Sequence, residues 1–472
     1  MVFSSAVFLY VFLPVTLILY YLMPGIKAKN IALTILSLIF YAWGEPVWVF
    51  LLIISSAMDY TVGRIIERFR GTNKAKLALV LSMVINLGFL AVFKYSGFFV
   101  ETVNGVLGAN IPVPNFSLPI GISFYTFQTM SYSIDVYRDK ADVQRSFLDF
   151  LLFVSIFPPL IAGPIIRYTD IQKQLNERGH SFEMFASGVT RFCIGLGKKA
   201  LIANHAGEIA SRFLDISGTG ASTLGVWYGV IMFTIQIYFD FSGYSDMAIG
   251  LGKMFGFSYA ENFNYPYISR SITEFWRRWH ISLSSFFRDY VYIPLGGNRK
   301  KQLRNLAVVW LLTGLWHGAS WNFILWGVYY GVLLIIEKYF LAKILDRLPS
   351  VVRVLYTAFI VVIGWCLFYF TDFKHLAQAL GIMFGVLKAG APDAAVRSIL
   401  ANSFFMVAAV FACTPAAKKL VEALFAKIAE KRAGLSGLLR SGLAAVSNTA
   451  IMVFSTAMLI SSSYNPFLYF RF

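Results

Sequence analysis

Apolar runs long enough to cross a membrane recur along the whole chain, and they restrict its fold more than any other feature. A helix needs about 17–25 mostly apolar residues to span the hydrocarbon core of a bilayer. Of the 472 residues, 58% are hydrophobic and only 14% are charged, a usage well outside that of soluble globular domains. The sequence therefore predicts an all-α, polytopic membrane protein.

The expected spans follow one another from the first residues to the last, with no soluble domain, internal repeat or linker visible between them. They are Ala6–Met23, Ile31–Trp43, Val47–Val62, Leu77–Phe93, Leu118–Tyr137, Leu224–Phe239, Val354–Phe370, Ile399–Ala412 and Ala445–Ile460. The second run is somewhat short for a straight crossing. A single domain over residues 1–472 is the simplest organisation of such a chain.

Basic residues outnumber acidic residues by 41 to 24, which gives a net charge of +17. The charges lie between the apolar runs, and no polar basic domain is visible that could follow a phosphate backbone, so we exclude nucleic-acid binding. Lysines and arginines gather at 27–29 and 64–76, whereas the turns near Glu45 and between Ser96 and Ser117 have none. By the positive-inside rule, the N-terminus is expected outside the cell.

Residues 418–432, "KKLVEALFAKIAEKR", have the pattern of an amphipathic helix. Five apolar side chains fall on one stripe, and lysines occupy much of the remaining surface. The stripe consists of Leu420, Val421, Leu424, Phe425 and Ile428. This pattern predicts a helix that lies on the anionic lipids of the cytoplasmic leaflet. An ordinary amphipathic connector explains it equally well.

Two apolar segments carry residues that interrupt a helix. Residues 150–168, "FLLFVSIFPPLIAGPIIRY", contain two prolines in succession and a Gly-Pro pair, which indicates a re-entrant hairpin. Residues 305–336 would form a helix about 48 Å long, against about 30 Å of hydrocarbon. We expect this second segment to break as well, and the residues that mark the break are Gly314, Gly318, Ser320 and Asn322.

His317 lies at that expected break, in a stretch with no Asp, Glu, Lys or Arg between Asn305 and Ile336. A first leg formed by Leu306–Leu315 would be about 15 Å long and would end near the middle of the bilayer. Non-helical backbone at that depth must be buried in protein or line a cavity. A desolvated imidazole there stays neutral and can take a proton from a hydroxyl during acyl transfer. The alternative is a packing histidine that hydrogen-bonds a carbonyl group.

A second histidine, His280, lies in "ITEFWRRWHISLSSFFRDYVYIPLGGNRKKQLR", which is too charged to span a membrane. On one continuous helix, Trp276 and His280 would share a face, with Trp279 beside them. Arginines and lysines in this segment could bind the phosphates of a nucleotide-linked donor. The basic residues concerned are Arg277, Arg278, Arg299, Lys300, Lys301 and Arg304. An interfacial aromatic belt and a positive-inside loop are the alternatives.

Two carboxylates occur in "YFDFSGYSDMAIG", near the expected end of a span. Asp240 and Asp246 would each need a partner, such as a histidine to orient or an arginine, and Gly243 permits a turn between them. Capping of a helix end by Asp240 is the alternative. The two histidines are 37 positions apart and neither has a nearby ligand of metal-binding spacing, so we predict no metal.

Several of these motifs, in the same order, resemble the membrane-bound O-acyltransferases, and within them the bacterial branch of the alginate O-acetylation membrane subunit. The motifs are "MVFSS", "IFPPLIAGPIIRY", "YFDFSGYSDMAIG", "FWRRWHISLSSFFRDYVYIPLGGNRK", "LTGLWHGASWNFILWG" and "YNPFLYFRF". The similarity extends nearly from end to end, which makes it specific. The family's teichoic acid D-alanyl transfer branch shares sequence of the "FFRDYVYIPLGGN" type.

The resemblance implies a ring of transmembrane helices around a central tunnel, with His317 as the catalytic histidine and His280 as a second signature histidine. We assign donor binding to Trp276, Trp279, Arg277, Arg278, Arg299 and Lys300, and the tunnel or its surroundings to Asp240, Asp246, Trp316 and Asn322. The resemblance also implies acetyl-CoA as a donor substrate, no tightly bound cofactor, a separate extracytoplasmic transferase partner, and a location in the bacterial cytoplasmic membrane.

The resulting hypothesis is an O-acyltransferase that passes acetyl groups across the membrane to a polysaccharide such as alginate. Transfer of D-alanyl or another acyl group from a carrier protein is an alternative within the family. A transporter of a polysaccharide or lipid, whose histidines relay protons, is an alternative from another class. A scaffold that only anchors a surface transferase is a third, and it predicts that both histidines can be replaced.

Overall fold

Helices make up all the regular secondary structure in the part of the chain that the computed structural model describes, as predicted. The described residues are all except 217–219, 432, 462–463, 466–467 and 469–472. Contacts divide the chain into two units, residues 1–192 with 244–260 and residues 193–243 with 261–472, which are described separately below. The expected single domain over residues 1–472 stays a prediction.

Seven helices among the described residues are long and apolar enough to cross a membrane, and a bent pair brings the number to eight. The seven are Gly25–Ala42, Trp48–Arg68, Asn73–Leu107, Thr223–Met254, Trp321–Leu345, Ser350–Tyr369 and Leu439–Ser461. The bent pair is Asp393–Ala401 with Ser403–Ala412, whose axes differ by 64°. The expected multi-pass character is therefore confirmed, while a central tunnel stays a prediction.

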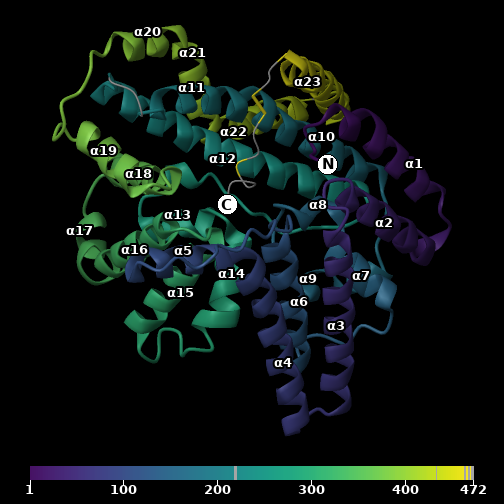
Figure 1. Cartoon of the computed structure of the whole chain (residues 1–472). Coiled ribbons are helices and arrows are strands. Elements are labelled where there is room, and N and C mark those ends of the chain that lie inside the picture. Colours follow the sequence, from purple (N-terminus) through teal and green to yellow (C-terminus); the bar gives the residue numbers. More distant parts are fainter. Residues whose placement is uncertain (217–219, 432, 462–463, 466–467, 469–472) are drawn as a thin grey trace. The chain divides into compact units, whose positions relative to one another are not determined.

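The first unit (Figure 1, dark purple to blue) is built mainly from helices that precede residue 193. Its elements are η1 (Phe8–Phe12), α1 (Leu13–Leu22), α2 (Gly25–Ala42), α3 (Trp48–Arg68), α4 (Asn73–Leu90), η2 (Ala91–Tyr95), α5 (Ser96–Leu107), α6 (Ile122–Tyr137), α7 (Phe147–Ser155), α8 (Phe157–Leu160), α9 (Tyr168–Asn176) and the first part of α10 (Phe182–Gly197). Helices α3, α4 and α6 pack against one another, and α7 packs on α2 and α3.

The proline-rich segment is broken, as expected. Helix α7 ends at Ser155, α8 begins at Phe157, and Ile156 between them leaves helical geometry with φ −53° and ψ 114°. Every residue from 150 to 166 is buried. The Phe157 N–H donates to Ser37 Oγ over 3.2 Å, so protein replaces the lost helical partner. The depth of this segment in a membrane stays a prediction.

Two expected boundaries of the first unit are wrong. Helix α2 begins at Gly25 rather than near Ile31, so its first turns include Lys27 and Lys29 and the helix reaches 18 residues. Long lysine side chains allow this, because their ammonium groups can extend toward the interface. The expected turn after Ser96 instead contains α5, which continues the apolar helix to Leu107.

The second unit contains the remaining helices. Its elements are η3 (Lys198–Ala203), α11 (Asn204–Leu214), most of α12 (Thr223–Met254), η4 (Pro266–Ile268), α13 (Ile272–Arg278), α14 (Ile281–Phe287), η5 (Arg288–Tyr292), α15 (Gln302–His317), α16 (Trp321–Ile336), η6 (Glu337–Leu341), α17 (Ala342–Leu345), α18 (Ser350–Tyr369), α19 (Phe373–Met383), α20 (Asp393–Ala401), α21 (Ser403–Ala412), α22 (Ala416–Lys431) and α23 (Ala433–Ser461). Helix α16 packs between α15 and α18, and α13 contacts both α16 and α18.

The expected span end near residue 239 is wrong, because α12 continues without interruption to Met254. Gly243 therefore lies inside a helix rather than in a turn. A Cβ atom at Gly243 would lie 2.8 Å from the carbonyl oxygen of Gly195, so the glycine permits close packing of α10 on α12. The sequence pattern predicted that Gly243 is needed for the backbone conformation of a turn. In the structure Gly243 is needed because it has no side chain, which leaves room for α10.

The expected break in residues 305–336 is confirmed. Helix α15 ends at His317, α16 begins at Trp321, and the two helices lie against each other as a hairpin (Figure 1). Glycines permit this approach, since a Cβ at Gly314 would lie 2.4 Å from the carbonyl oxygen of Phe323. The first leg begins at Gln302, earlier than expected, and its depth in the membrane stays a prediction.

Residues 416–431 form α22, in agreement with the amphipathic pattern. Leu420, Val421 and Leu424 are exposed in the protein, whereas Phe425 is buried. An exposed apolar stripe beside lysines is the surface that a membrane-lying helix presents. The C-terminal motif "YNPFLYFRF" falls largely outside the described residues.

Candidate active site

His317 occupies the last position of α15, where the helical hairpin breaks. Its imidazole is surrounded by aromatic rings on three helices, with centroid separations of 5.0 Å to Trp316, 4.8 Å to Trp326 and 5.4 Å to Phe368. The residue is only 8% exposed. Because the rings of α16 and α18 enclose it, the orientation of this histidine is fixed by packing.

His280 lies between two short helices, α13 and α14, which are outside the candidate membrane spans. Its backbone is left-handed, with φ 45° and ψ 54°, a conformation that is uncommon for residues other than glycine. The residue is 1% exposed, and its ring contacts Phe241 at 4.7 Å and Trp316 at 5.6 Å between centroids. Backbone of this kind persists where the surroundings hold it and is concentrated at functional sites.

The indole of Trp316 contacts both histidines. The tertiary structure thus brings together two residues that are 37 positions apart in the sequence. It also corrects the expected arrangement of Trp276 and His280, which do not lie on one helix. Helix α13 ends at Arg278 and Trp279 is extended, so the direction of the chain changes before His280.

Asn262 holds His280 from a loop that sequence reasoning missed. This asparagine is fully buried, and its Oδ1 lies 3.2 Å from His280 Nδ1. The same oxygen accepts hydrogen bonds from the backbone N–H of Ser282 at 3.2 Å and from its hydroxyl at 2.9 Å. The Asn262 carbonyl oxygen accepts from the Ile281 N–H at 3.0 Å, so the loop also fixes the first turn of α14.

Burial lowers the pKa of His280 to about 3, because the protonated ring would lose its hydration without gaining a negative partner. The imidazole is therefore neutral near pH 7. Among the described residues, no partner hydrogen-bonds to its Nε2, although that atom is buried. A neutral imidazole with a buried, available nitrogen can accept a hydrogen bond from a bound molecule.

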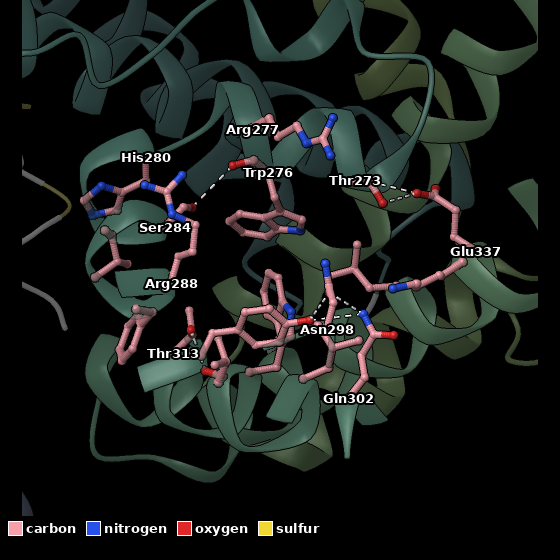
Figure 2. A pocket seen from close by; sticks show the side chains of 18 of the residues that line it. Thr273, Trp276, Arg277, His280, Ser284, Arg288, Asn298, Gln302, Thr313 and Glu337 are labelled. Carbon is pink, nitrogen blue, oxygen red and sulfur yellow. Dashed lines mark hydrogen bonds between the residues drawn. The ribbon is translucent and has the colours of Figure 1, made fainter. Parts of the chain in front are cut away.

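A cavity of about 550 Å³ adjoins His280 and is formed entirely by the second unit. Its lining residues are Thr273, Trp276, Arg277, His280, Leu283, Ser284, Phe287, Arg288, Tyr292, Asn298, Gln302, Leu306, Val309, Trp310, Thr313, Leu334, Glu337, Lys338 and Ala342. Figure 2 shows Glu337 and His280 at opposite sides of this group, with the ring of His280 turned away from Trp276. The lining reaches Thr313, one turn before His317, but does not include His317 itself.

Glu337 is the one carboxylate among those lining residues, and sequence reasoning missed it. It is 3% exposed and accepts hydrogen bonds from the backbone N–H groups of Ile272 at 2.7 Å and Thr273 at 2.9 Å. It also accepts from the Thr273 hydroxyl at 2.6 Å (Figure 2). Since these donors belong to the start of α13, Glu337 caps that helix and fixes the wall that carries Trp276.

The expected donor-binding residues are distributed unevenly around the cavity. Trp276 and Arg277 line it, whereas Arg278 makes an ion pair with Glu274 at 2.9 Å. Trp279 is buried beside the cavity wall and is not a lining residue. Arg299 and Lys300 are exposed on the turn that precedes α15. Two cations that the prediction did not include, Arg288 and Lys338, line the cavity.

The remaining residues that we assigned to the tunnel have partners other than the histidines. Asp240 makes a buried ion pair with Lys199 at 2.6 Å and accepts from the Leu468 N–H at 2.9 Å. Asp246 pairs with Arg191 at 2.6 Å, one of the two options that the sequence left open.

Asn322, near the start of α16, donates from Nδ2 to the carbonyl oxygens of Leu367 and Phe368, at 3.4 and 3.2 Å. It therefore joins the start of α16 to the end of α18, next to the ring of Phe368 that contacts His317.

The arrangement combines a mostly apolar cavity, three cations and His280 on its lining, and a second buried histidine, His317, outside that lining. Such a cavity can accept an elongated anion with an apolar part. Among the described residues, no three His, Cys, Asp or Glu side chains are close enough to share a metal ion. The side chains at the site can act as acids, bases and hydrogen-bonding groups.

Comparison with known proteins gives one matching family over most of the chain. The model of the membrane-bound O-acyltransferase family matches residues 52–377. A probable alginate O-acetylase of Azotobacter vinelandii is 47% identical over 78% of this chain and 75% of its own length. A peptidoglycan O-acetyltransferase of Helicobacter pylori is 34% identical over 82% of this chain and 80% of its own. A teichoic acid D-alanyltransferase of Streptococcus thermophilus is 28% identical over 66% and 72%, respectively.

Proposed function

Because this chain belongs to the membrane-bound O-acyltransferase family, we propose that it passes acetyl groups from cytosolic acetyl-CoA to an extracytoplasmic polysaccharide such as alginate. The observation that carries this proposal is the contact of both histidines with one indole, that of Trp316, behind a cavity able to hold a donor. The acetyl group and the polysaccharide are inferred from the Azotobacter relative, which is 47% identical.

Acetyl-CoA would enter the cavity of the second unit from the cytoplasmic side. Arg277, Arg288 and Lys338 would bind its phosphates, since guanidinium and ammonium groups pair well with phosphate oxygens. Arg299 and Lys300 would raise the positive potential outside the cavity entrance. Arg278 and Trp279 would support the cavity wall that carries Trp276 and Arg277. The apolar lining between Leu306 and Trp310 suits the uncharged arm that carries the thioester.

In the transfer step, His317 would take the proton from the acceptor hydroxyl as the oxygen forms a bond to the thioester carbonyl carbon. The carbon–sulfur bond then breaks, and the leaving thiolate recovers the proton from His317. General-base assistance of this kind is typically worth about 10²–10⁴-fold in rate. The aromatic rings around His317 would exclude water, which otherwise competes with the acceptor.

His280 would have a different role, because its pKa of about 3 leaves it almost no affinity for a proton near pH 7. A group with so low a pKa is a poor general base, but its free nitrogen can hold a hydroxyl or thiol in place. We therefore assign proton transfer to His317 and orientation of a reacting group to His280.

The proposed setting is the cytoplasmic membrane of a bacterium, with the N-terminus outside. The basic segments 27–29 and 64–76 would then face the cytosol, where the donor is. A passage that leads past His317 to the outer surface would deliver the acetyl group to a separate extracytoplasmic transferase. The exposed apolar stripe of α22 would lie on lipids of the cytoplasmic leaflet.

The remaining relatives suggest one other acceptor and one other acyl group. Similarity to a peptidoglycan O-acetyltransferase favours a cell-wall glycan, and similarity to a teichoic acid D-alanyltransferase favours a different acyl group. Both relatives are less similar to this chain than the Azotobacter protein is. Family membership argues against the transporter and scaffold hypotheses, because neither requires a site for acyl transfer.

The experiment uses inverted membrane vesicles that contain the protein and its extracytoplasmic transferase partner, with acetyl-labelled acetyl-CoA outside and unmodified alginate inside. We expect alkali-labile label on the alginate, and a loss of at least about 100-fold in the initial rate for His317→Ala. The matched control is His375→Ala, since 45% of the His375 side chain is exposed and the residue pairs with Asp372, three positions earlier. Full activity of His317→Ala in correctly inserted protein would contradict the proposal. Vesicles filled with peptidoglycan or supplied with a D-alanyl carrier test the two alternatives.

A further inference from the structure

We propose that Asn262 is a positioning residue for the transfer reaction: it holds His280 in the tautomer with the proton on Nδ1, so that Nε2 can accept a hydrogen bond from a reacting group. Only the role of Nε2, acceptance of a hydrogen bond from a reacting group, rests on the proposed function. The assignment of the tautomer itself depends on contacts within the second unit alone.

The first step is the orientation of the Asn262 amide. Its oxygen and nitrogen have similar shapes, so their assignment must come from the hydrogen-bond partners. The backbone N–H of Ser282 points at the amide from 3.2 Å and can only donate. An amide NH₂ group in that position would place two donors against each other, so the atom that faces Ser282 is Oδ1.

The hydrogen-bond partner of the His280 ring determines which ring nitrogen carries its proton. Its Nδ1 lies 3.2 Å from the same Oδ1. A carbonyl oxygen can only accept, and a neutral imidazole carries one proton, so that proton must be on Nδ1. Nε2 then has a lone pair and no proton. The backbone of α14 thereby sets the tautomer of the histidine through the Asn262 side chain.

The other ring nitrogen of His280, Nε2, is left able to accept a hydrogen bond. The atom is buried, and no partner hydrogen-bonds to it among the described residues. A buried acceptor without a partner costs free energy, and structures retain such groups where a ligand supplies the missing donor. The ring of His280 contacts Trp316, whose indole also contacts His317. A second hydroxyl of the bound acceptor, or a thiol, can therefore donate to Nε2 close to the proposed base, while the reacting hydroxyl gives its single proton to His317.

The opposite tautomer would not serve. With the proton on Nε2, His280 would present a donor there, and a bound hydroxyl or thiol could no longer donate a hydrogen bond to that nitrogen. Because burial lowers the pKa of His280, the ring does not take up a second proton near pH 7. Asn262 thus decides whether the second histidine accepts a hydrogen bond from the bound molecule or donates one to it.

Nitrogen NMR tests the tautomer directly in the full-length protein. The chain has five histidines, so ¹⁵N-histidine labelling gives few signals, and His280→Gln identifies those of His280. We expect a protonated Nδ1 and an unprotonated Nε2, and loss of this single tautomer in Asn262→Ala. Asn305→Ala is the matched control, because Asn305 is also fully buried and its amide donates only to Gly297 and Lys300 carbonyls. A proton on Nε2 in the wild-type protein would overturn the proposal.

The pH dependence of acetyl transfer tests the role of the acceptor. Asn262→Asp keeps an oxygen that accepts from Nδ1, and its own rate at pH 8 is the reference for its pH profile. Its negative charge should raise the pKa of His280, so protonation would remove the Nε2 acceptor at a higher pH. We expect the rate of Asn262→Asp to fall tenfold or more between pH 8 and 6, with no such fall in wild type. A flat profile for Asn262→Asp would contradict the proposal.

The two experiments separate this inference from the proposed function. If His317→Ala keeps full activity while the tautomer is as stated, the proposed function fails and the assignment of Asn262 to the tautomer stands. If His317→Ala is inactive while Asn262→Ala keeps both the tautomer and the rate, the inference fails and the proposed function stands.

Discussion

Two buried polar clusters of this protein differ in whether their central group has all its hydrogen-bond partners. This difference distinguishes a structural cluster from a functional one. In the first unit, the carboxylate of Asp59 accepts hydrogen bonds from Ser82 at 2.5 Å, Asn86 at 2.8 Å and Ser133 at 3.0 Å. In the second unit, His280 has a partner for Nδ1 but, among the described residues, none for Nε2.

Both clusters are almost inaccessible to solvent, since Asp59 is 0% and His280 is 1% exposed. The Asp59 cluster joins α3, α4 and α6, and several donors satisfy its carboxylate, which is the usual condition of a buried charge-bearing group in a membrane protein. The His280 cluster leaves one strong acceptor open. Burial alone therefore does not identify a functional group; an unused hydrogen-bonding capacity beside a cavity does.

The largest expected effect is on the satisfied cluster. Asp59→Ala should lower the free energy of unfolding by roughly 3 kcal/mol, because three buried donors lose their common acceptor. The transfer rate per folded molecule should be unchanged. Thermal unfolding in detergent and the vesicle assay measure the two quantities. A large loss of rate in folded Asp59→Ala would break the contrast between the clusters.

His280→Gln should have the opposite result. We expect the transfer rate to fall about 10- to 100-fold, since the flexible Gln side chain does not hold an acceptor at the position of Nε2 as the packed ring does. This loss corresponds to roughly 1.4–2.7 kcal/mol of activation free energy. Thermal stability at pH 7.5 should change little, because one neutral polar side chain replaces another of similar length. Unfolding without a loss of specific activity would assign His280 to structure instead.

Acid should destabilise the protein through His280. Its pKa is about 3 in the folded protein and about 6.5 in the unfolded chain, so the unfolded state binds more protons between these values. Its contribution is fully present above pH 6.5 and is lost as the pH falls below it. From pH 7.5 to 5.5, wild type should lose about 1–2 kcal/mol more than His280→Gln. Parallel melting curves for the two proteins would contradict the expected burial of a neutral ring.

The smallest expected effect is that of one donor in the satisfied cluster. Ser133→Ala removes one of the three hydrogen bonds to Asp59 and should cost about 1 kcal/mol or less of unfolding free energy. Ser282→Ala is the corresponding change near His280 and should alter the ¹⁵N signals of that ring, which Ser133→Ala should not do. Equal effects of both variants on those signals would remove the distinction between the two clusters.

The breaks in apolar helices could be predicted from the sequence because proline and glycine act locally. The prolines near Ile156 remove helical hydrogen bonds whatever their surroundings are, and Gly318 directly follows the end of α15. The length of α12 could not be predicted in this way. Gly243 gives the same local signal in a turn as in a packed helix, and only the approach of Gly195 selects the helix.

The candidate site shows the same limit. His317 was found because a histidine is unusual in an apolar run, and His280 because of its motif. Asn262 and Glu337 were missed, since a lone asparagine in a loop and a glutamate after an apolar run have no local pattern that reveals a role. Their partners, on α14 and α13, are distant in the chain.

The order of apolar and basic segments determined that this chain is a helical, multi-pass membrane protein, because lipid requires each span to satisfy its own backbone hydrogen bonds. The motifs determined the family. The tertiary structure decided which groups meet: it placed Trp316 against both histidines and turned an asparagine toward one of them. Contacts between distant segments depend on packing of the whole unit, and so the state of a single imidazole proton is set far from its own sequence neighbours.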